Sequence, residues 1–107
     1  MTIHNFFIVY MEVIITKSKK KDKKFDATID GKKTISFGAK GYTDFTQSKN
    51  PPQKQRCLNR HRAREDWTNP KTAGFYSANV LWNKTTIKSS VADISKKFSK
   101  LNIKLNI

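Results

Sequence analysis

The hydrophobic positions in the first third of the chain follow patterns that are typical of strands. Residues 3–16 (IHNFFIVYMEVIIT) are rich in Ile, Val, Phe and Tyr, which favour extended structure. Phe25, Ala27 and Ile29 alternate with polar residues, and Ile35 and Phe37 resume the alternation further along the chain. Between them, Asp30-Gly31 supplies a turn that accepts positive φ angles. The pattern predicts a three-stranded antiparallel β-meander.

The second half of the chain has helical patterns. Asn50 can cap a helix with prolines in its first turn, and we expect this helix to run to about Asp66. Residues 74–82 (GFYSANVLW) predict a short buried helix. Ser90 and Asp93 form a weak capping box. An apolar stripe at spacings of three and four then predicts a further helix, with the members Ile87, Val91, Ile94, Phe98 and Leu101.

These patterns predict an α+β fold: a small three-stranded antiparallel β-meander followed by two to three short helices. Residues 12–100 form a single basic domain, with residues 1–11 as an N-terminal apolar extension. Residues 101–107 (LNIKLNI) form a C-terminal tail with the alternation of a strand. The apolar start lacks the features of a signal peptide and is shorter than the ~20 residues that span a bilayer. The sequence leaves open whether Met1 or Met11 is the true start.

The net charge of the chain restricts the kinds of partner that it can bind. The 107 residues include 22 Lys and Arg against 8 Asp and Glu, so the formal net charge is +14. Such a chain repels itself and is less repelled beside an anionic partner. Nucleic acid, an anionic membrane surface and an acidic protein face are the candidate partners.

Two basic segments are the candidate polyanion-binding sites. Residues 17–24 hold six lysines and one aspartate, and as a hairpin tip they would form a basic finger. On the predicted helix, arginines spaced by four would line one ridge suited to phosphates. For each of these two segments, the alternative to polyanion binding is a surface that is simply solvated. The predicted polyanion-binding residues are Lys19, Lys20, Lys21, Lys23, Lys24, Lys54, Arg56, Arg60, Arg62 and Arg64.

The aromatic residues of the second half allow three interpretations. Trp67, Tyr76 and Trp82 are our candidates for a protein interface, because a Trp at the edge of a core often anchors one. The same side chains could stack on exposed bases. Their helical spacing also favours a place in the core.

No constellation in the sequence indicates an enzyme. Cys57 and His61 lie one turn apart, but no motif supplies an orienting third group or an oxyanion site. A single cysteine permits no intramolecular disulfide and no multi-cysteine zinc site. We therefore expect a non-enzymatic protein with no cofactor, no metal and no small-molecule substrate.

Three stretches carry a family resemblance: DGKKTISFGAKGYTDFT, LNRHRAREDWT and KTAGFYSANVLWNK. Together they resemble an uncharacterised family of small basic proteins encoded by large nucleocytoplasmic DNA viruses of algae, amoebae and other protists. The resemblance covers about residues 12–98. The chain departs from the family pattern after TDFT, where QSKNPPQ stands in place of an acidic or histidine-containing segment.

The resemblance implies a viral structural protein, such as a minor capsid component of the virion. It would bind neighbouring capsid proteins and an anionic surface, which could be viral DNA or the inner membrane. Its expected location is the virion, and the host cytoplasm or nucleus during assembly. The apolar ends of the chain could each add a strand to a neighbour's sheet. The alternative is a sequence-independent nucleic-acid-binding protein that contacts phosphates through the basic helix and the lysine-rich loop.

Overall fold

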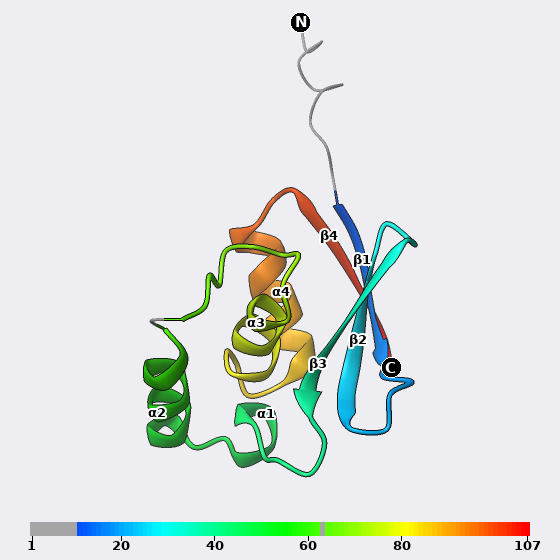
Figure 1. The fold of residues 1–107 in the computed structure, drawn as a ribbon. Coiled ribbons are helices and arrows are strands. Elements are labelled where there is room, and N and C mark those ends of the chain that lie inside the picture. Colours follow the sequence, from blue (N-terminus) through cyan, green and yellow to red (C-terminus); the bar gives the residue numbers. More distant parts are fainter. Residues whose placement is uncertain (1–10, 63) are drawn as a thin grey trace, which may run out of the picture.

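The structure, a computed structural model, describes residues 11–62 and 64–107. In this part of the chain, one four-stranded sheet is accompanied by four α-helices and a π-helical turn (Figure 1). The strands are β1 (Met11–Lys17), β2 (Lys23–Ile29), β3 (Lys33–Ala39) and β4 (Leu101–Asn106). The helical elements are α1 (Phe45–Ser48), α2 (Pro51–His61), α3 (Ala73–Tyr76), the π-helical turn η2 (Ser77–Leu81) and α4 (Ile87–Lys97).

The expected mixed α+β class is confirmed, and the meander matches in part. β1 pairs antiparallel with β2, and β2 with β3. The turn between β2 and β3 uses Asp30 and Gly31 at φ angles of 52° and 66°, as the dipeptide predicts. The sheet, however, has a fourth strand, in the order β3-β2-β1-β4.

The fourth strand is formed by the residues that we expected to be a C-terminal tail. β4 lies parallel to β1, with Met11 opposite Leu101 and Thr16 opposite Asn106. The strand character of this segment is therefore confirmed for residues 101–106, but the strand belongs to the sheet of its own chain. Residues 1–10, the bulk of the predicted apolar extension, lie outside the described residues.

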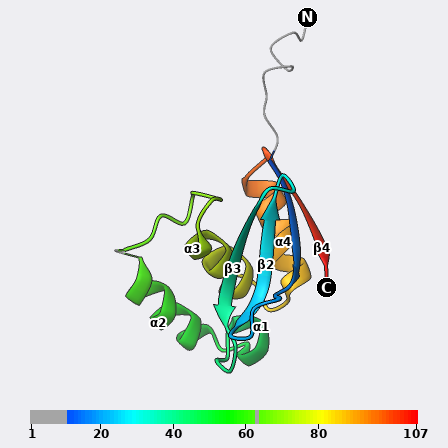
Figure 2. The same cartoon turned by 45° about the vertical axis from the view of Figure 1, so that its right-hand side comes forward.

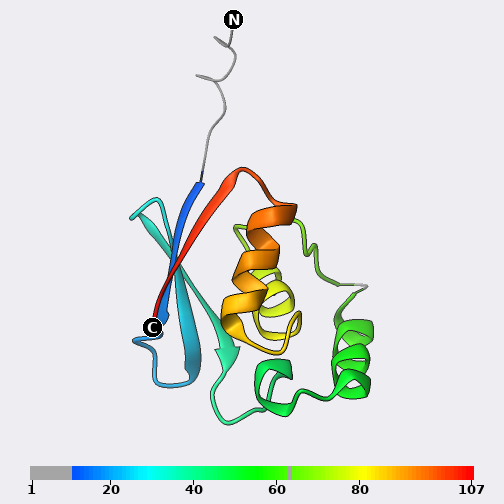
Figure 3. The ribbon, with the colours of Figure 1, turned by 180° about the vertical axis from the view of Figure 1, so that it is seen from behind.

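The core lies between the sheet and the helices α3, η2 and α4, which cover one face of the sheet (Figures 1 and 3). Side chains such as Val13, Ile15 and Phe37 point from the sheet into this core, and Phe75 and Ile94 meet them from the helices. The opposite face carries exposed residues. α2 stands apart from this layer and buries Cys57 alone among its residues (Figure 2).

The predicted boundaries of the last long helix are wrong at both ends. The last long helix, α4, is capped by Thr86, whose side chain accepts a hydrogen bond from the Ser89 amide at 3.0 Å. Ser90 lies inside α4, fully buried, and accepts a hydrogen bond from the Lys84 amide at 3.0 Å. The helical stripe also ends early, because the chain leaves the helix at Phe98 and Leu101 begins β4.

α2 begins as predicted, with the Asn50 side chain accepting from the Gln53 amide at 3.2 Å. It ends at His61, and not near Asp66. Arg62 and residues 64–66 are all exposed, so a longer helix would have no apolar face to pack against the body.

Candidate functional site

The first basic region is the loop between β1 and β2, which we call the lysine loop (residues 18–22). A buried carboxylate holds it in place. Asp26, 6% exposed, accepts hydrogen bonds from the Ser18 hydroxyl at 2.6 Å and from the Ser36 hydroxyl at 2.7 Å. The Lys19 amide adds a third at 3.3 Å. The hairpin tip is thus anchored at its base. It presents the exposed residues Lys19, Lys20 and Lys21.

Two opposing effects set the pKa of the Asp26 carboxyl. Burial raises this pKa, while the hydrogen bonds from Ser18, Ser36 and the Lys19 amide lower it, as does the charge of Lys20. The net shift is downward, so Asp26 is ionised at neutral pH. An ionised carboxylate accepts hydrogen bonds more strongly than a neutral one, which favours an ordered lysine loop.

The lysine loop lies against the loop from β3 to α1, which we call the Tyr42 loop (residues 40–43). The Lys40 amide donates to the Asp22 carbonyl at 2.9 Å. Both loops therefore lie at the same end of the sheet, beside α1 (Figure 1). The side chain of Tyr42 is 75% exposed at this end. No sequence pattern singled out Tyr42, and its one signal is an aromatic residue in a glycine-containing loop.

Lys24, predicted to contact a polyanion, points into the fold instead. Its ammonium group donates to Asp44 Oδ2 at 2.7 Å, to Gln47 Oε1 at 2.9 Å and to the carbonyl of Tyr42. The Lys24 and Asp44 side chains are only 13% and 5% exposed. Asp44 also caps α1, so this ion pair joins β2 to the start of that helix.

Lys54, on α2, is likewise turned inward. Its Nζ donates to the Asn83 carbonyl at 2.7 Å and lies 5.0 Å from the centroid of the Phe45 ring. Burial lowers the pKa of Lys54, and repulsion from Lys84 and Lys97 lowers it further. Lys54 therefore fastens α2 to the body and does not face solvent as a phosphate contact would.

The predicted ridge of three arginines does not form, because α2 ends at His61. Arg56 and Arg60 are exposed on α2. Arg62 follows the helix, with its guanidinium carbon 5.9 Å from the Trp67 ring centroid. Arg64 lies in the turn beyond. α2 thus contributes two exposed arginines in place of a ridge of three.

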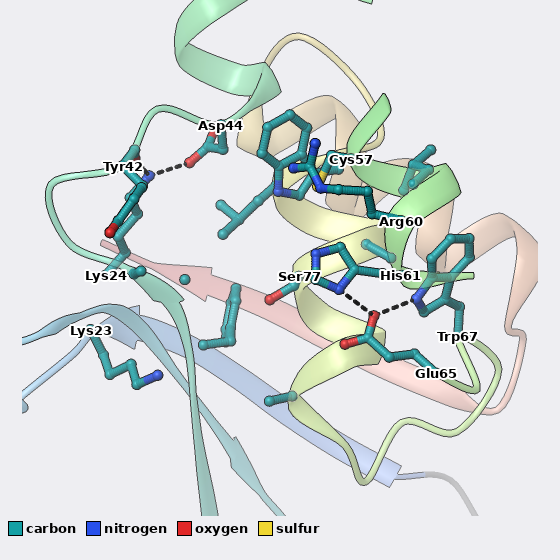
Figure 4. A pocket seen from close by; sticks show the side chains of 18 of the residues that line it. Lys23, Lys24, Tyr42, Asp44, Cys57, Arg60, His61, Glu65, Trp67 and Ser77 are labelled. Atoms are coloured by element: carbon teal, nitrogen blue, oxygen red, sulfur yellow. Dashed lines mark hydrogen bonds and ion pairs between the residues drawn. The ribbon is translucent and has the colours of Figure 1, made fainter. Parts of the chain in front are cut away.

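A cleft of about 360 Å³ lies between α2 and the body. In Figure 4, Tyr42 and Asp44 lie on one side of it, and His61 and Trp67 lie on the other. Its lining combines cations with aromatic and small residues. Among them are Lys23, Cys57, Arg60, Ser77, Ala78, Leu81 and Trp82.

Glu65 orders one end of this cleft. Its Oε2 accepts a hydrogen bond from Trp67 Nε1 at 3.0 Å and lies 3.8 Å from His61 Nδ1 (Figure 4). This arrangement fixes the Trp67 ring, which is half-buried, at the edge of the cleft. Glu65 also places a carboxylate at this end of the cleft, where Arg62 lies over the Trp67 ring.

The single thiol is poorly placed for chemistry. Cys57 is 8% exposed, and burial raises the pKa of its thiol, an effect that Arg60 only partly offsets. A protonated thiol is a weak nucleophile. Among the described residues, no three His, Cys, Asp or Glu side chains gather as metal ligands would.

A second hollow, of about 680 Å³, lies on the other side of the Tyr42 loop. Lys17, Ser18 and Lys40 contribute to its lining. Tyr42 and Thr43 line this hollow and the cleft alike, together with Lys24 and Asp44. The exposed ring of Tyr42 therefore stands between two basic depressions.

The predicted protein-interface residues have different environments. Tyr76 is fully buried, with its ring centroid 5.5 Å from that of Phe37 and 4.9 Å from that of Phe75. Tyr76 is therefore a core residue, and its prediction as an interface residue is wrong. Trp67 and Trp82 are half-buried and line the cleft.

A family of unknown function (DUF5754) has a model that matches residues 13–61. The matched stretch covers just under half of the chain, from β1 through α2. It includes the lysine loop, Tyr42 and both exposed arginines of α2. No curated protein and no solved structure matches the chain.

None of the helices in residues 11–62 and 64–107 has the length and apolar character needed to cross a membrane.

Proposed function

We propose that the protein is a non-enzymatic binding protein whose exposed cations contact nucleic acid through its phosphates. The observation that carries this proposal is the excess of cations without acidic partners. Within the described residues, the lysine–carboxylate pairs are Lys24–Asp44 and Lys97–Asp93, against 22 Lys and Arg in the chain. Phosphates would relieve the repulsion among the rest and release the counterions of the polymer.

The arrangement of the exposed cations supports a defined contact region. Lys19, Lys20 and Lys21 lie on a loop anchored by Asp26, and Arg60 faces the cleft on the other side of the Tyr42 loop. An anchored loop loses less conformational entropy on binding than a free one. The contact region is therefore the end of the molecule where the lysine loop and the Tyr42 loop meet.

The test is the affinity for an oligonucleotide at several salt concentrations. Phosphate contacts predict that log K falls linearly with log salt, by about 0.9 per contact for a duplex and about 0.7 for a single strand. No binding at ~50 mM salt, where such contacts are strong, would refute the proposal.

A matched pair of triple variants separates a contact region from net charge alone. K19Q/K20Q/K21Q removes three charges from the lysine loop. K32Q/K33Q/K100Q removes three exposed charges from the opposite end of the sheet, where β1 begins. We expect the first variant to lose at least tenfold more affinity than the second, which is about 1.4 kcal/mol. Equal losses would show that the charge acts diffusely.

A second candidate function is that of a minor capsid component in a virion, which the viral resemblance favours. Two features of the fold are compatible with protein contacts: Trp67 and Trp82 at the cleft, and β4 at the edge of the sheet with Ile107 53% exposed beyond it. An edge strand has unpaired backbone groups that a neighbouring chain can use. Chemical cross-linking of purified particles should join this chain to a capsid protein. Its presence in infected cells and absence from particles would refute this role.

A further inference from the structure

The contact region holds an exposed aromatic ring that phosphate binding alone does not use. We propose that the nucleic acid is single-stranded and that one of its bases stacks on Tyr42. This inference rests on the proposed function and specifies its ligand.

The exposure of Tyr42 is the first observation. At 75%, its side chain is more exposed than Ile107 at 53% or Ile14 at 41%, the other exposed large hydrophobic residues of the described chain. Tyrosine rings usually bury most of their large apolar surface. A base is a planar partner that would cover such a ring.

The ring is exposed on an ordered backbone, which is the second observation. The Tyr42 amide donates to the Ala39 carbonyl at 3.3 Å, and the Tyr42 carbonyl accepts from the Lys24 ammonium. Lys24 is in turn held by Asp44 and Gln47. The backbone that bears the ring is therefore held before a ligand arrives, so little backbone entropy is lost on stacking.

Cations on both sides of the ring are the third observation. Lys17 and Lys40 line the hollow on one side of Tyr42, and Lys23 and Arg60 line the cleft on the other. A strand that crosses from one depression to the other would pass over Tyr42 with phosphates near cations on both sides. This combination of a stacking platform and a basic path is how proteins bind single strands without sequence preference.

The ring also distinguishes among polyanions. In a duplex the faces of the bases are stacked on one another, so Tyr42 could not reach them without unstacking. Heparin and an acidic polypeptide offer negative charge without bases. Tyr42 should therefore matter for a single strand and contribute little with the other polymers.

The experiment measures the affinity for four probes by competition: a 15-nucleotide oligo(dT), a duplex of the same length, heparin and poly-glutamate. Tyr42→Ala should weaken oligo(dT) binding about 5- to 150-fold, the range for loss of one stacked base. It should change duplex and heparin binding less than twofold. Tyr42→Phe should retain oligo(dT) binding, because the ring is kept. Ile14→Ala, which removes exposed apolar surface elsewhere, should have no effect.

Circular dichroism checks that Tyr42→Ala is folded. A second test uses the unaltered chain and an oligonucleotide that contains 5-iodouracil. After irradiation, Tyr42 should be the residue cross-linked to this oligonucleotide. Equal effects of Tyr42→Ala on all probes, or none on any, would overturn the stacking proposal while leaving phosphate binding intact. Preferred binding of poly-glutamate would favour an acidic protein partner and overturn it as well. Binding to none of the probes would overturn the proposed function itself.

Discussion

The lysine loop and α2 are both basic, and each has one lysine that turns into the fold. Near the lysine loop, Lys24 meets a buried carboxylate, Asp44. On α2, Lys54 meets a backbone carbonyl and the face of the Phe45 ring. Lysines in a basic segment are therefore not equivalent. Their neighbours in space decide whether the charge supports the fold or is left for a partner.

The two inward lysines should differ in how much they stabilise the fold. Removing Lys24 leaves the Asp44 carboxylate, 5% exposed, without its cation. Removing Lys54 leaves no buried charge and relieves its repulsion with Lys84 and Lys97.

Lys24→Met should have the largest effect on stability. Because it leaves a buried carboxylate unpaired, it should reduce the free energy of unfolding by about 3–5 kcal/mol. Chemical denaturation measures the change. Lys19→Met, which alters an exposed lysine close by, is the control and should stay within about 0.5 kcal/mol of the original chain. Comparable losses in the two variants would mean that the Lys24–Asp44 pair is not structural.

Asp26→Asn should have the next largest effect, a loss of about 1–3 kcal/mol at neutral pH, because it removes an ionised acceptor of three hydrogen bonds. The folded-state pKa of Asp26 lies below its ordinary value of about 3.9. The stabilisation is therefore complete above that ordinary value and disappears as the pH falls through the folded pKa. Denaturation between pH 7 and pH 2 should show the two proteins converging in acid. A difference that persists at the lowest pH would argue against this role of the charge.

Lys54→Met should change the free energy of unfolding by less than about 1 kcal/mol, because the lost hydrogen bond and ring contact are offset by relief of burial and repulsion. The folded-state pKa of Lys54 lies below the ordinary value of about 10.4. The charged lysine therefore disfavours folding below its folded pKa, and this penalty disappears as the pH rises toward the ordinary value. Between pH 7 and pH 10.5, the free energy of unfolding of the original chain should rise relative to that of the variant. A loss as large as that of Lys24→Met would erase the distinction between the two lysines.

Arg56→Ala and Arg60→Ala should have the smallest effect on stability, within about 0.5 kcal/mol, since both side chains are exposed. Thermal unfolding checks this expectation. Of the two, only Arg60 lines the cleft, so its variant should weaken nucleic-acid binding more. Equal binding losses would place the contact along the whole of α2.

Local patterns predicted the local elements of the fold. The Asp30-Gly31 turn, the start of α2 at Asn50 and the apolar face of α4 each depend on residues close in sequence. The pairing of β1 with β4 joins residues 90 apart, as in the bond from Asn102 to Glu12, and a strand pattern does not name its partner. For the same reason the sequence pattern placed residues 101–107 in a tail outside the domain, whereas β4 belongs to its sheet.

The candidate site was harder to predict, because a run of charged residues does not indicate which groups lie next to it in the fold. Lys54 bonds to a carbonyl 29 residues away, and Lys24 to a carboxylate 20 residues away. The spacing of the arginines by four indicated a continuous helix but not the end of α2 at His61. Tyr42 carried no periodic pattern, and its exposure follows from the two loops that meet at one end of the sheet.

The most direct test of this account is the salt dependence of oligo(dT) binding for K19Q/K20Q/K21Q beside that for Lys54→Gln. If exposed lysines contact phosphates and the inward lysine does not, the triple variant should reduce the slope of log K against log salt by about two. This is about 0.7 for each lost contact with a single strand. Lys54→Gln should leave the slope unchanged. The contrary result is that Lys54→Gln reduces the slope by about 0.7, as much as each lysine of the triple variant does on average. This result would contradict the division between structural and partner-binding cations.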